Sequence, residues 1–319
     1  MGKDISMRAL KRTRALPGGG KFSWYKLGNT LTPYLFLLIP LILYLIWVIG
    51  PMLYTFYLSL TRWDGMTPPV FYSANPLRNY QRLFRDPVFA ISLRNNLRWM
   101  ISFITIPVVM GLALAMALNR SLPGAKFIKA SFYSPMVLSL VVCGLIWSWM
   151  YHPARGLINE VLRFLTNNPN LTIGWLSDSQ LVMWAIIAVA VWRQVGYVMV
   201  LYLAGLQGID PGLIDATKVD GANGWQTFRH VIFPLLGPVT VIVVVISIID
   251  SLRAFDLVSV MTRGGPYNSS SVLANYMYIQ AFNNYRMGYS SAIAVVLFLI
   301  SLVFIFIYLW HILQDELEY

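Results

Sequence analysis

Charged side chains are scarce in this sequence. They make up 12% of its 319 residues, and acidic ones are the scarcest, with 13 Asp plus Glu against 24 Lys plus Arg. A soluble domain of average composition carries about 25% charged residues. Hydrophobic residues instead make up 57% of the chain, and the mean hydropathy is +0.62. This composition excludes a soluble globular protein and indicates an integral membrane protein.

Residues that bind metals are also few. The single cysteine, Cys143, lies in an apolar stretch, so the chain can form neither a disulfide framework nor a cysteine-based metal site. The three histidines, His152, His230 and His311, lie far apart, without a carboxylate or second histidine at metal-ligand spacing. No G-x-S-x-G motif occurs. We therefore expect no metal, no catalytic residues and no enzyme activity on this chain.

A nucleotide-binding loop is missing as well. Residues 18–21 read Gly-Gly-Gly-Lys, but Ala15 stands where a P-loop has its first glycine and Phe22 where it has Ser or Thr. The chain thus carries no cofactor site of its own that we can recognise. If the protein moves a solute uphill, the energy must come from a partner protein or an ion gradient.

The positive charge is concentrated at the N-terminus. The formal net charge is +11, and within residues 1–30 the only anion is Asp4. Such an arm is typical of a cytoplasmic tail facing anionic lipid. No basic helix or aromatic platform accompanies it, so we expect no nucleic-acid partner. The seven cations of the arm are Lys3, Arg8, Lys11, Arg12, Arg14, Lys21 and Lys26.

Long apolar stretches predict the spans. A helix needs about 20 apolar residues to cross the bilayer core. The first such stretch begins more than 30 residues into the chain and has no small-residue cleavage site, so we expect it to be retained. The fold class predicted is all-α integral membrane, with six transmembrane helices. The stretches are Pro33–Tyr54, Trp99–Leu118, Ser131–Met150, Leu181–Leu206, Leu236–Phe255 and Tyr289–Trp310.

Charge also predicts the orientation. Six crossings place both termini on one side, and the basic arm at 1–32 favours the cytoplasm. The inner segments together hold 12 of the 24 cations, no more than the rest of the chain, so the arm decides the assignment. We expect an arm at 1–32, a first helix at 33–54, a transmembrane domain at 90–310 and a cytoplasmic tail at 311–319. The outer loops, 55–98, 151–180 and 256–288, are long enough either to dock a partner or simply to cap the bundle.

The inner loop between spans four and five, residues 207–235, carries the most informative pattern. Pro211 can open a helix after Asp210, Gly221 permits a turn, and a second helix is expected from about Gly224 to Pro234. The loop is therefore predicted to be a helix–turn–helix outside the membrane.

This loop resembles the E-A-A…D-G-A…F…I…P loop of the permease subunits of binding-protein-dependent ABC importers, carbohydrate branch, which includes the larger maltose permease subunit. In this sequence it reads Asp215-Ala216-Thr217 and then Asp220-Gly221-Ala222. The family's glutamate is Asp215 here and its second alanine is Thr217. The same branch is suggested by Asn79-Tyr80, Asp86–Phe89, Gly156–Asn159, Leu203–Gln207 and Gly264–Pro266.

The resemblance implies a coupling helix that seats in a groove of an ATPase subunit, with ATP and Mg bound by that partner. Such a helix would transmit a change in the ATPase to the permease, because the partner favours one of two conformations of the permease over the other. The alternative for Asp215 and Asp220 is helix capping without partner contact. The residues implied in coupling are Asp215, Ala216, Thr217, Asp220, Gly221 and Ala222.

Two ionisable residues lie inside predicted spans and are site candidates by default. Arg193 is 13 residues from Leu206 and Asp250 is 14 from Leu236, so at 1.5 Å per residue both lie about 20 Å from the inner end. Carboxylate, amide, guanidinium and aromatic groups suit a sugar. The resemblance places cargo contacts at equivalent positions. The pathway residues predicted are Arg193, Gln194, Tyr197, Ser247, Asp250 and Ser251.

Several alternatives stay open at this point. Arg193 and Asp250 could form a salt bridge that only joins two helices, and the second permease could hold the main cargo site. The cargo could be a phosphorylated polyol such as glycerol 3-phosphate, bound by Arg193 and Arg253. From other classes, a gradient-driven transporter would need inverted repeats, which we do not find, and a membrane enzyme would need an acid–base or metal cluster.

The expected protein is therefore a permease subunit in a bacterial or archaeal cytoplasmic membrane. It would import a carbohydrate or polyol by alternating access. Its implied partners are a second similar permease, an ATPase dimer and an extracytoplasmic solute-binding protein.

Overall fold

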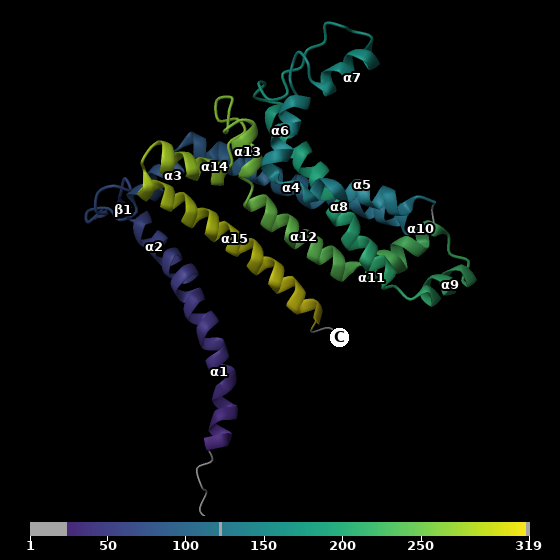
Figure 1. Ribbon diagram of the computed structural model, residues 1–319, viewed down its shortest axis with the longest axis horizontal. Coiled ribbons are helices and arrows are strands. Elements are labelled where there is room, and N and C mark those ends of the chain that lie inside the picture. Colours follow the sequence, from purple (N-terminus) through teal and green to yellow (C-terminus); the bar gives the residue numbers. More distant parts are fainter. Residues whose placement is uncertain (1–23, 121–122, 317–319) are drawn as a thin grey trace, which may run out of the picture. The chain divides into compact units, whose positions relative to one another are not determined.

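The computed structural model describes residues 24–120 and 123–316, and this part is almost entirely helical. Two short strands, β1 (Thr61–Arg62) and β2 (Val70–Phe71), form an antiparallel hairpin. The helices, drawn in Figure 1, are α1 (Trp24–Tyr44), α2 (Gly50–Ser59), α3 (Arg78–Phe84), α4 (Pro87–Leu118), α5 (Ala125–Val137), α6 (Leu140–Met150), α7 (Leu157–Thr166), α8 (Val182–Gln207), α9 (Pro211–Val219), α10 (Gly224–Thr227), α11 (Phe233–Leu235), α12 (Gly237–Leu252), α13 (Asp256–Met261), α14 (Leu273–Tyr278) and α15 (Met287–Glu316), with π-helical turns at Leu45–Ile49, Phe228–Ile232 and Ile279–Asn283.

The chain divides into two units, Met1–Tyr54 and Thr55–Tyr319. The described part of the first unit is one helical segment, and its apolar side chains are exposed, as Phe36 at 76% illustrates. The helix predicted for 33–54 is thus longer at both ends, because α1 begins at Trp24 and α2 ends at Ser59. Residues 1–23 of the predicted basic arm, and 317–319 of the predicted tail, lie outside the described residues.

Four helical segments of the described chain are long and apolar enough to cross a membrane: Tyr34–Ser59, Pro87–Leu118, Val182–Gln207 and Met287–Ile307. Two further pairs of helices meet this test only together, because each pair is bent. One pair is Ala125–Val137 with Leu140–Met150, and the other is Gly224–Leu235 with Gly237–Leu252. Length and composition therefore give between four and six spans.

The segment expected to be one helix, 131–150, is two helices that meet at 103°. Pro135 lies in the last turn of α5, and Leu138 has an extended backbone, with φ −72° and ψ 141°. Ser139 then begins α6, with its Oγ accepting a hydrogen bond from the Val142 N–H at 3.3 Å. A continuous apolar run conceals this break, since Pro135 and Ser139 are its only local signals.

Helix α4 begins at Pro87, twelve residues before the start predicted from hydropathy. Asp86 caps it, accepting a hydrogen bond from the Val88 N–H at 2.9 Å. Three polar residues of its first turns, Ser92, Asn95 and Asn96, are buried and bonded across the fold. Asn95 donates to the carbonyls of Ser269 and Ser271 at 2.7 and 2.9 Å. These residues look like loop residues in the sequence because their partners are more than 170 positions away.

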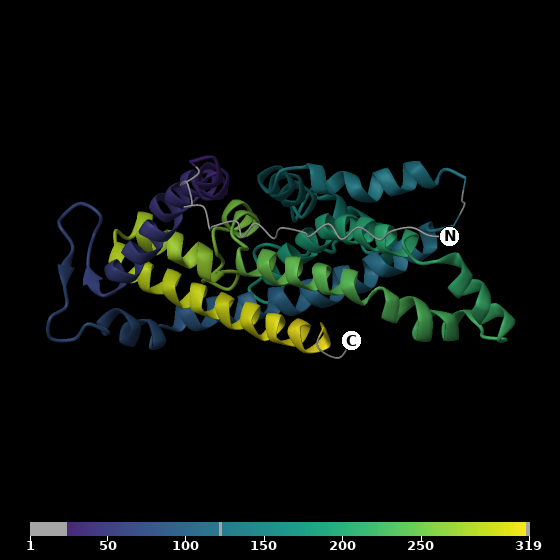
Figure 2. The same cartoon turned by 90° about the horizontal axis from the view of Figure 1, so that it is seen from below.

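The core of the second unit forms where α4 packs along α8. Trp99 and Phe103 of α4 meet the first half of α8, while Ala115 and Leu118 meet its last half, so the two helices run parallel. Helices α12 and α15 lie side by side in both views of the ribbon (Figures 1 and 2). The segment α9–α10 therefore lies at the end of the bundle opposite α3.

A glycine allows α8 to approach α5 closely. A Cβ on Gly196 would lie 1.8 Å from the Phe132 carbonyl oxygen, which is backbone and cannot rotate away. We expect Gly196→Ala to destabilise the protein by about 1–3 kcal/mol, the usual cost of overpacking. Thermal unfolding in detergent measures this cost. The control is Gly237→Ala, where an added Cβ meets nothing within 4 Å, and an equal effect of both changes would contradict the prediction.

One carboxylate ties three elements together near the start of α4. Asp86 accepts hydrogen bonds from the hydroxyls of Tyr276 on α14 and Tyr289 on α15, the latter at 2.7 Å. Burial alone would raise the pKa of Asp86, but these bonds and that from the Val88 N–H outweigh it and lower the pKa. Burial and the nearby carboxylate raise the pKa of Tyr276 to about 12, so Tyr276 stays a neutral donor.

This lowered pKa predicts a pH effect on stability. Asp86 ionises more readily in the folded chain than in the unfolded chain, where its pKa is about 3.9. Its stabilising contribution is therefore present above that pH and is lost as the pH falls through the folded pKa. The difference in unfolding temperature between wild type and Asp86→Asn should shrink as the pH is lowered from 7 to below about 4. A difference independent of pH would contradict this role of Asp86.

Candidate functional site: a protruding helix pair and a charged cavity

Helix α9 has well-formed ends. Its N-terminal cap is Asp210, whose carboxylate accepts a hydrogen bond from the Gly212 N–H at 2.9 Å. At its other end the Ala222 N–H donates to the Thr217 carbonyl at 2.9 Å, and Gly221 takes φ +77°. Helices commonly end with such a left-handed glycine. The motif Asp-Gly-Ala thus closes α9 and turns the chain toward α10.

The second helix of the pair is fixed to the first. Asn223 and Gln226 form a reciprocal capping box at the start of α10. The hydroxyls of Thr217 on α9 and Thr227 on α10 lie 3.0 Å apart, within hydrogen-bonding distance. Threonine in place of the family's alanine therefore contributes an internal hydrogen bond, and the two helices form one unit.

The remaining predicted coupling residues face solvent. Asp215 forms an ion pair with Lys218 at 2.7 Å, with both side chains 69% exposed. Asp220 and Ala216 are exposed, and Ala222 is half-buried. Neither Asp215 nor Asp220 caps the start of α9, since Asp210 does so. Both carboxylates are thus accessible to a partner.

Hydrophobic side chains on this helix pair are also exposed. The exposed fraction is 46% for Leu213, 65% for Trp225 and 88% for Val219. In both ribbon views α9 lies beyond the ends of α8 and α12, away from the core (Figures 1 and 2). Exposed apolar side chains on a protruding helix are typical of a protein-binding surface. The sequence alone does not distinguish these three side chains from the other apolar residues of the loop, because their exposure depends on the fold.

A cavity of about 310 Å³ lies where α4, α8 and α12 meet the start of α13. Four charged side chains line it: Arg193, Arg253, Asp250 and Asp256. Gln194 also lines it, and its Nε2 donates to Asp250 Oδ2 at 3.5 Å. The apolar part of the wall includes Trp99, Phe103, Phe255 and Leu140. Charged, amide and aromatic groups thus line the same cavity.

Arg193 also bonds to the break between α5 and α6. Its Nη2 donates to the Met136 carbonyl at 3.3 Å and its Nε to the Leu138 carbonyl at 3.4 Å. These carbonyls lose their helical partners at the break, and the guanidinium replaces them. Among the described residues Arg193 and Asp250 form no ion pair. Asp250 therefore has no direct ion-pair partner, and its charge is offset only by the two arginines that line the same cavity.

Three predicted pathway residues lie outside this lining. Ser247 and Ser251 are buried, and their hydroxyls donate to the Val243 and Ile248 carbonyls of their own helix. Tyr197 is half-buried. The structure thus brings Arg193, Gln194 and Asp250 together but does not place the other three with them.

The spacing i, i+3, i+4 places Ser247, Asp250 and Ser251 on one helix face, but it does not predict which residues of that face line the cavity. Asp256 was missed because the span was expected to end at Phe255. In the structure the helix ends at Leu252 and the chain turns back to present Asp256. Trp99 and Phe103 were read only as part of an apolar span.

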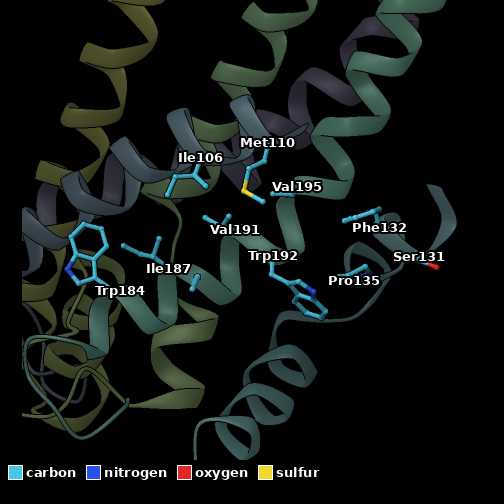
Figure 3. A pocket seen from close by; sticks show the side chains of 11 residues that line it. Ile106, Met110, Ser131, Phe132, Pro135, Trp184, Ile187, Val191, Trp192 and Val195 are labelled. Atoms are coloured by element: carbon cyan, nitrogen blue, oxygen red, sulfur yellow. The ribbon is translucent and has the colours of Figure 1, made fainter. Parts of the chain in front are cut away.

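A larger cavity of about 520 Å³ lies between α4, α5 and α8 (Figure 3). Figure 3 shows Trp184 and Trp192 of α8, Phe132 of α5 and Met110 of α4 around it. Its lining is apolar except for Ser131. A polyhydroxylated solute could make few hydrogen bonds there, so the smaller, charged cavity is the better candidate for polar cargo.

Comparison with known proteins decides the family. Residues 87–314 match the family described as binding-protein-dependent transport system inner membrane component. The chain belongs to this family. As an inner-membrane component of this type it is a multi-pass membrane protein, and the resemblance inferred from the loop is confirmed.

Individual relatives of this transport component span nearly the whole chain. This chain is 36% identical over 286 residues to a probable ABC transporter permease protein of Pyrococcus horikoshii, and the alignment covers 89% of this chain and 97% of that protein. It is 31% identical over 279 residues to the trehalose/maltose transport system permease protein of Thermococcus litoralis, covering 86% and 92%.

A solved structure gives the fold. A bacterial alginate ABC transporter, crystallised in complex with an alginate pentasaccharide-bound periplasmic protein, contains a chain that aligns with a TM-score of 0.76. The identity is 20%, and the alignment covers 89% of this chain and 95% of that one. The described helices thus have the fold of an ABC importer permease.

Proposed function

We propose that this chain is a membrane-spanning permease subunit of an ATP-driven importer, and that its cargo is a carbohydrate or related polyol. The charged cavity between α4, α8 and α12 carries the proposal. Two guanidinium groups and two carboxylates line it, so its formal charge is balanced. A neutral polyhydroxylated solute matches this lining, because carboxylate, amide and guanidinium groups pair with hydroxyls while aromatic rings cover apolar sugar faces.

The relatives support the same cargo class. The permease of Thermococcus litoralis is named for trehalose and maltose, and the transporter with the similar fold is described as importing an acidic polysaccharide. A phosphorylated polyol such as glycerol 3-phosphate is the alternative, with Arg193 and Arg253 as its anion contacts. The two carboxylates in the same lining, Asp250 and Asp256, disfavour a doubly charged phosphate.

Energy is proposed to enter through α9. The exposed surface formed by α9 and α10 would seat on an ATPase subunit, which binds ATP and Mg and carries out the hydrolysis. A second similar permease would complete the pathway, and a soluble solute-binding protein would deliver the cargo outside. Alternating access then follows when closure of the ATPase dimer changes the relative position of the permease halves.

The proposed function also implies an orientation of the chain in the membrane. Counting each bent pair as one crossing gives six transmembrane helices, with both termini and α9 in the cytoplasm of a bacterial or archaeal cell. Membership in a binding-protein-dependent family disfavours the gradient-driven carrier. In that class of transporter an ion gradient, and not a partner ATPase, supplies the energy.

The proposal is tested by purifying the tagged chain from native membranes and measuring ATP hydrolysis. An ATPase and a second permease should co-purify. Hydrolysis should rise only when the binding protein and one saccharide of a panel are both added, and glycerol 3-phosphate serves as the competing cargo. A chain that emerges alone and still transports solute would overturn the proposal in favour of a secondary carrier.

A further inference from the structure

Five arginines line two adjoining cavities at the end of the bundle where α4 and α15 begin. The cavities measure about 800 and 620 Å³ and share Arg62, Tyr72, Asn79 and Arg82. They lie between the β1–β2 hairpin, α3 and the residues that precede α15. We call the five side chains the arginine cradle: Arg62, Arg78, Arg82, Arg85 and Arg286.

The positive charge of the arginine cradle outweighs the negative charge beside it, with five guanidinium groups against the carboxylates of Asp64 and Asp86. All five arginines are exposed, and none forms an ion pair with a described carboxylate. The two carboxylates that line the same cavities are already held by other donors. Asp64 accepts hydrogen bonds from the Met66 and Thr67 N–H groups at 3.0 and 2.9 Å, and Asp86 accepts from two tyrosines.

Aromatic rings hold two of the arginines in place without removing their charge. The Arg78 guanidinium lies 5.3 Å from the centroid of the Tyr72 ring, and that of Arg82 lies 5.1 Å from the Tyr289 ring. The backbone beneath is fixed by the buried Asn79 amide, which donates to the Ser59 and Thr61 carbonyls at 2.8 and 2.9 Å. Two of the five arginines are therefore preorganised, which lowers the entropic cost of binding an anion.

The arginine cradle lies at the level where apolar helices end. Arg62 follows the candidate span that ends at Ser59, while Arg85 and Arg286 precede those that begin at Pro87 and Met287. Trp63, Tyr72 and Tyr285 line the same cavities. Tryptophan and tyrosine beside span ends are typical of the headgroup region of a bilayer. Arginines at this level meet lipid phosphates.

We propose that the arginine cradle binds the phosphate of an anionic lipid headgroup, in the leaflet at the end of the bundle opposite α9. Guanidinium groups suit this ligand because each offers paired N–H donors that match two phosphate oxygens. The closeness of three arginines to span ends, and the aromatic lining, favour a lipid over the acidic face of a soluble protein. This inference does not depend on the nature of the cargo.

The test measures lipid retention by the intact importer complex. Wild type and Arg62→Gln/Arg85→Gln are purified in detergent containing either phosphatidylglycerol or phosphatidylcholine, and bound lipid is counted by native mass spectrometry. Neither arginine stacks on a ring in the structure. We expect phosphatidylglycerol, and not phosphatidylcholine, to be retained by wild type and to be lost several-fold in the variant.

Two further variants guard against loss of folding. Arg62→Lys/Arg85→Lys keeps the charge and should retain most of the lipid, and Arg155→Gln removes an exposed arginine from the loop between α6 and α7 and should retain all of it. In a separate arm inorganic phosphate competes with the lipid, and displacement at equal ionic strength would assign the site to a free anion. Unchanged lipid retention in the glutamine variant, or loss only of binding-protein docking, would overturn the proposal.

Discussion

Replacing Val219 with aspartate is expected to reduce binding-protein-stimulated ATP hydrolysis by about tenfold or more, without unfolding the chain. Val219 is 88% exposed on α9, so the change removes no contact within this subunit. Burying a valine at an interface contributes about 1.5–3 kcal/mol, and an unpaired carboxylate in its place adds a desolvation cost. Since each 1.4 kcal/mol is about tenfold in affinity, the ATPase should dissociate.

Affinity purification of the tagged chain, followed by quantification of the ATPase subunit, measures this loss directly. Val161→Asp is the matched control, because Val161 is an exposed valine, at 46%, on α7, which is not part of a candidate span. The control should retain the ATPase. If Val219→Asp retained both the ATPase and its stimulated activity, then α9 would not be the docking element.

Replacing Asp250 with asparagine is expected to reduce uptake of the cargo by about tenfold to a hundredfold. The carboxylate lines the charged cavity without an ion-pair partner among the described residues, and its one hydrogen bond, from Gln194, is 3.5 Å long. A hydrogen bond from a cargo hydroxyl to a charged acceptor contributes about 1.5–3 kcal/mol, and asparagine gives up that charge. Uptake into proteoliposomes that contain the complete importer measures the effect.

Thermal unfolding separates cargo binding from folding in this variant. Asparagine has nearly the same shape, so the unfolding temperature should not fall and association with the ATPase should not change. Asp178→Asn is the control, because Asp178 lies in an exposed loop and accepts hydrogen bonds only from nearby backbone N–H groups. Normal uptake by Asp250→Asn would place the cargo site elsewhere, for example on the second permease.

Hydropathy alone predicts some helices closely and others poorly, and the reason is physical. The stretch 181–206 coincides almost residue for residue with α8, at Val182–Gln207, because the whole helix is apolar and charge interrupts it only at Arg193. Helix α4 was predicted too short because four of the five residues from 94 to 98 are polar: Arg94, Asn95, Asn96 and Arg98. A hydropathy profile reports water affinity, whereas Asn95 and Asn96 find their partners inside the fold.

The candidate site divides in the same way. Counting residues along two spans placed Arg193 and Asp250 at one depth, and both line one cavity. Their partners could not be predicted, because they depend on how α5 breaks. The sequence could not show that the Met136 and Leu138 carbonyls become free acceptors beside Arg193. The helix ends in the loop at 207–235 could be predicted more fully, since its turn, caps and glycine are all local signals.

The two bonds from Arg193 limit how this transporter can change its specificity. The same guanidinium borders the cavity and satisfies the backbone of the broken segment α5–α6. A substitution there would disturb helix geometry as well as the cargo contact proposed for Arg193, so this residue is not free to vary with the solute. Within the described part of the chain, the side chains of Asp250 and Asp256 form no hydrogen bond to a backbone group that would hold a helix break in place. New cargo would therefore be accommodated by changing these carboxylates around a constant arginine.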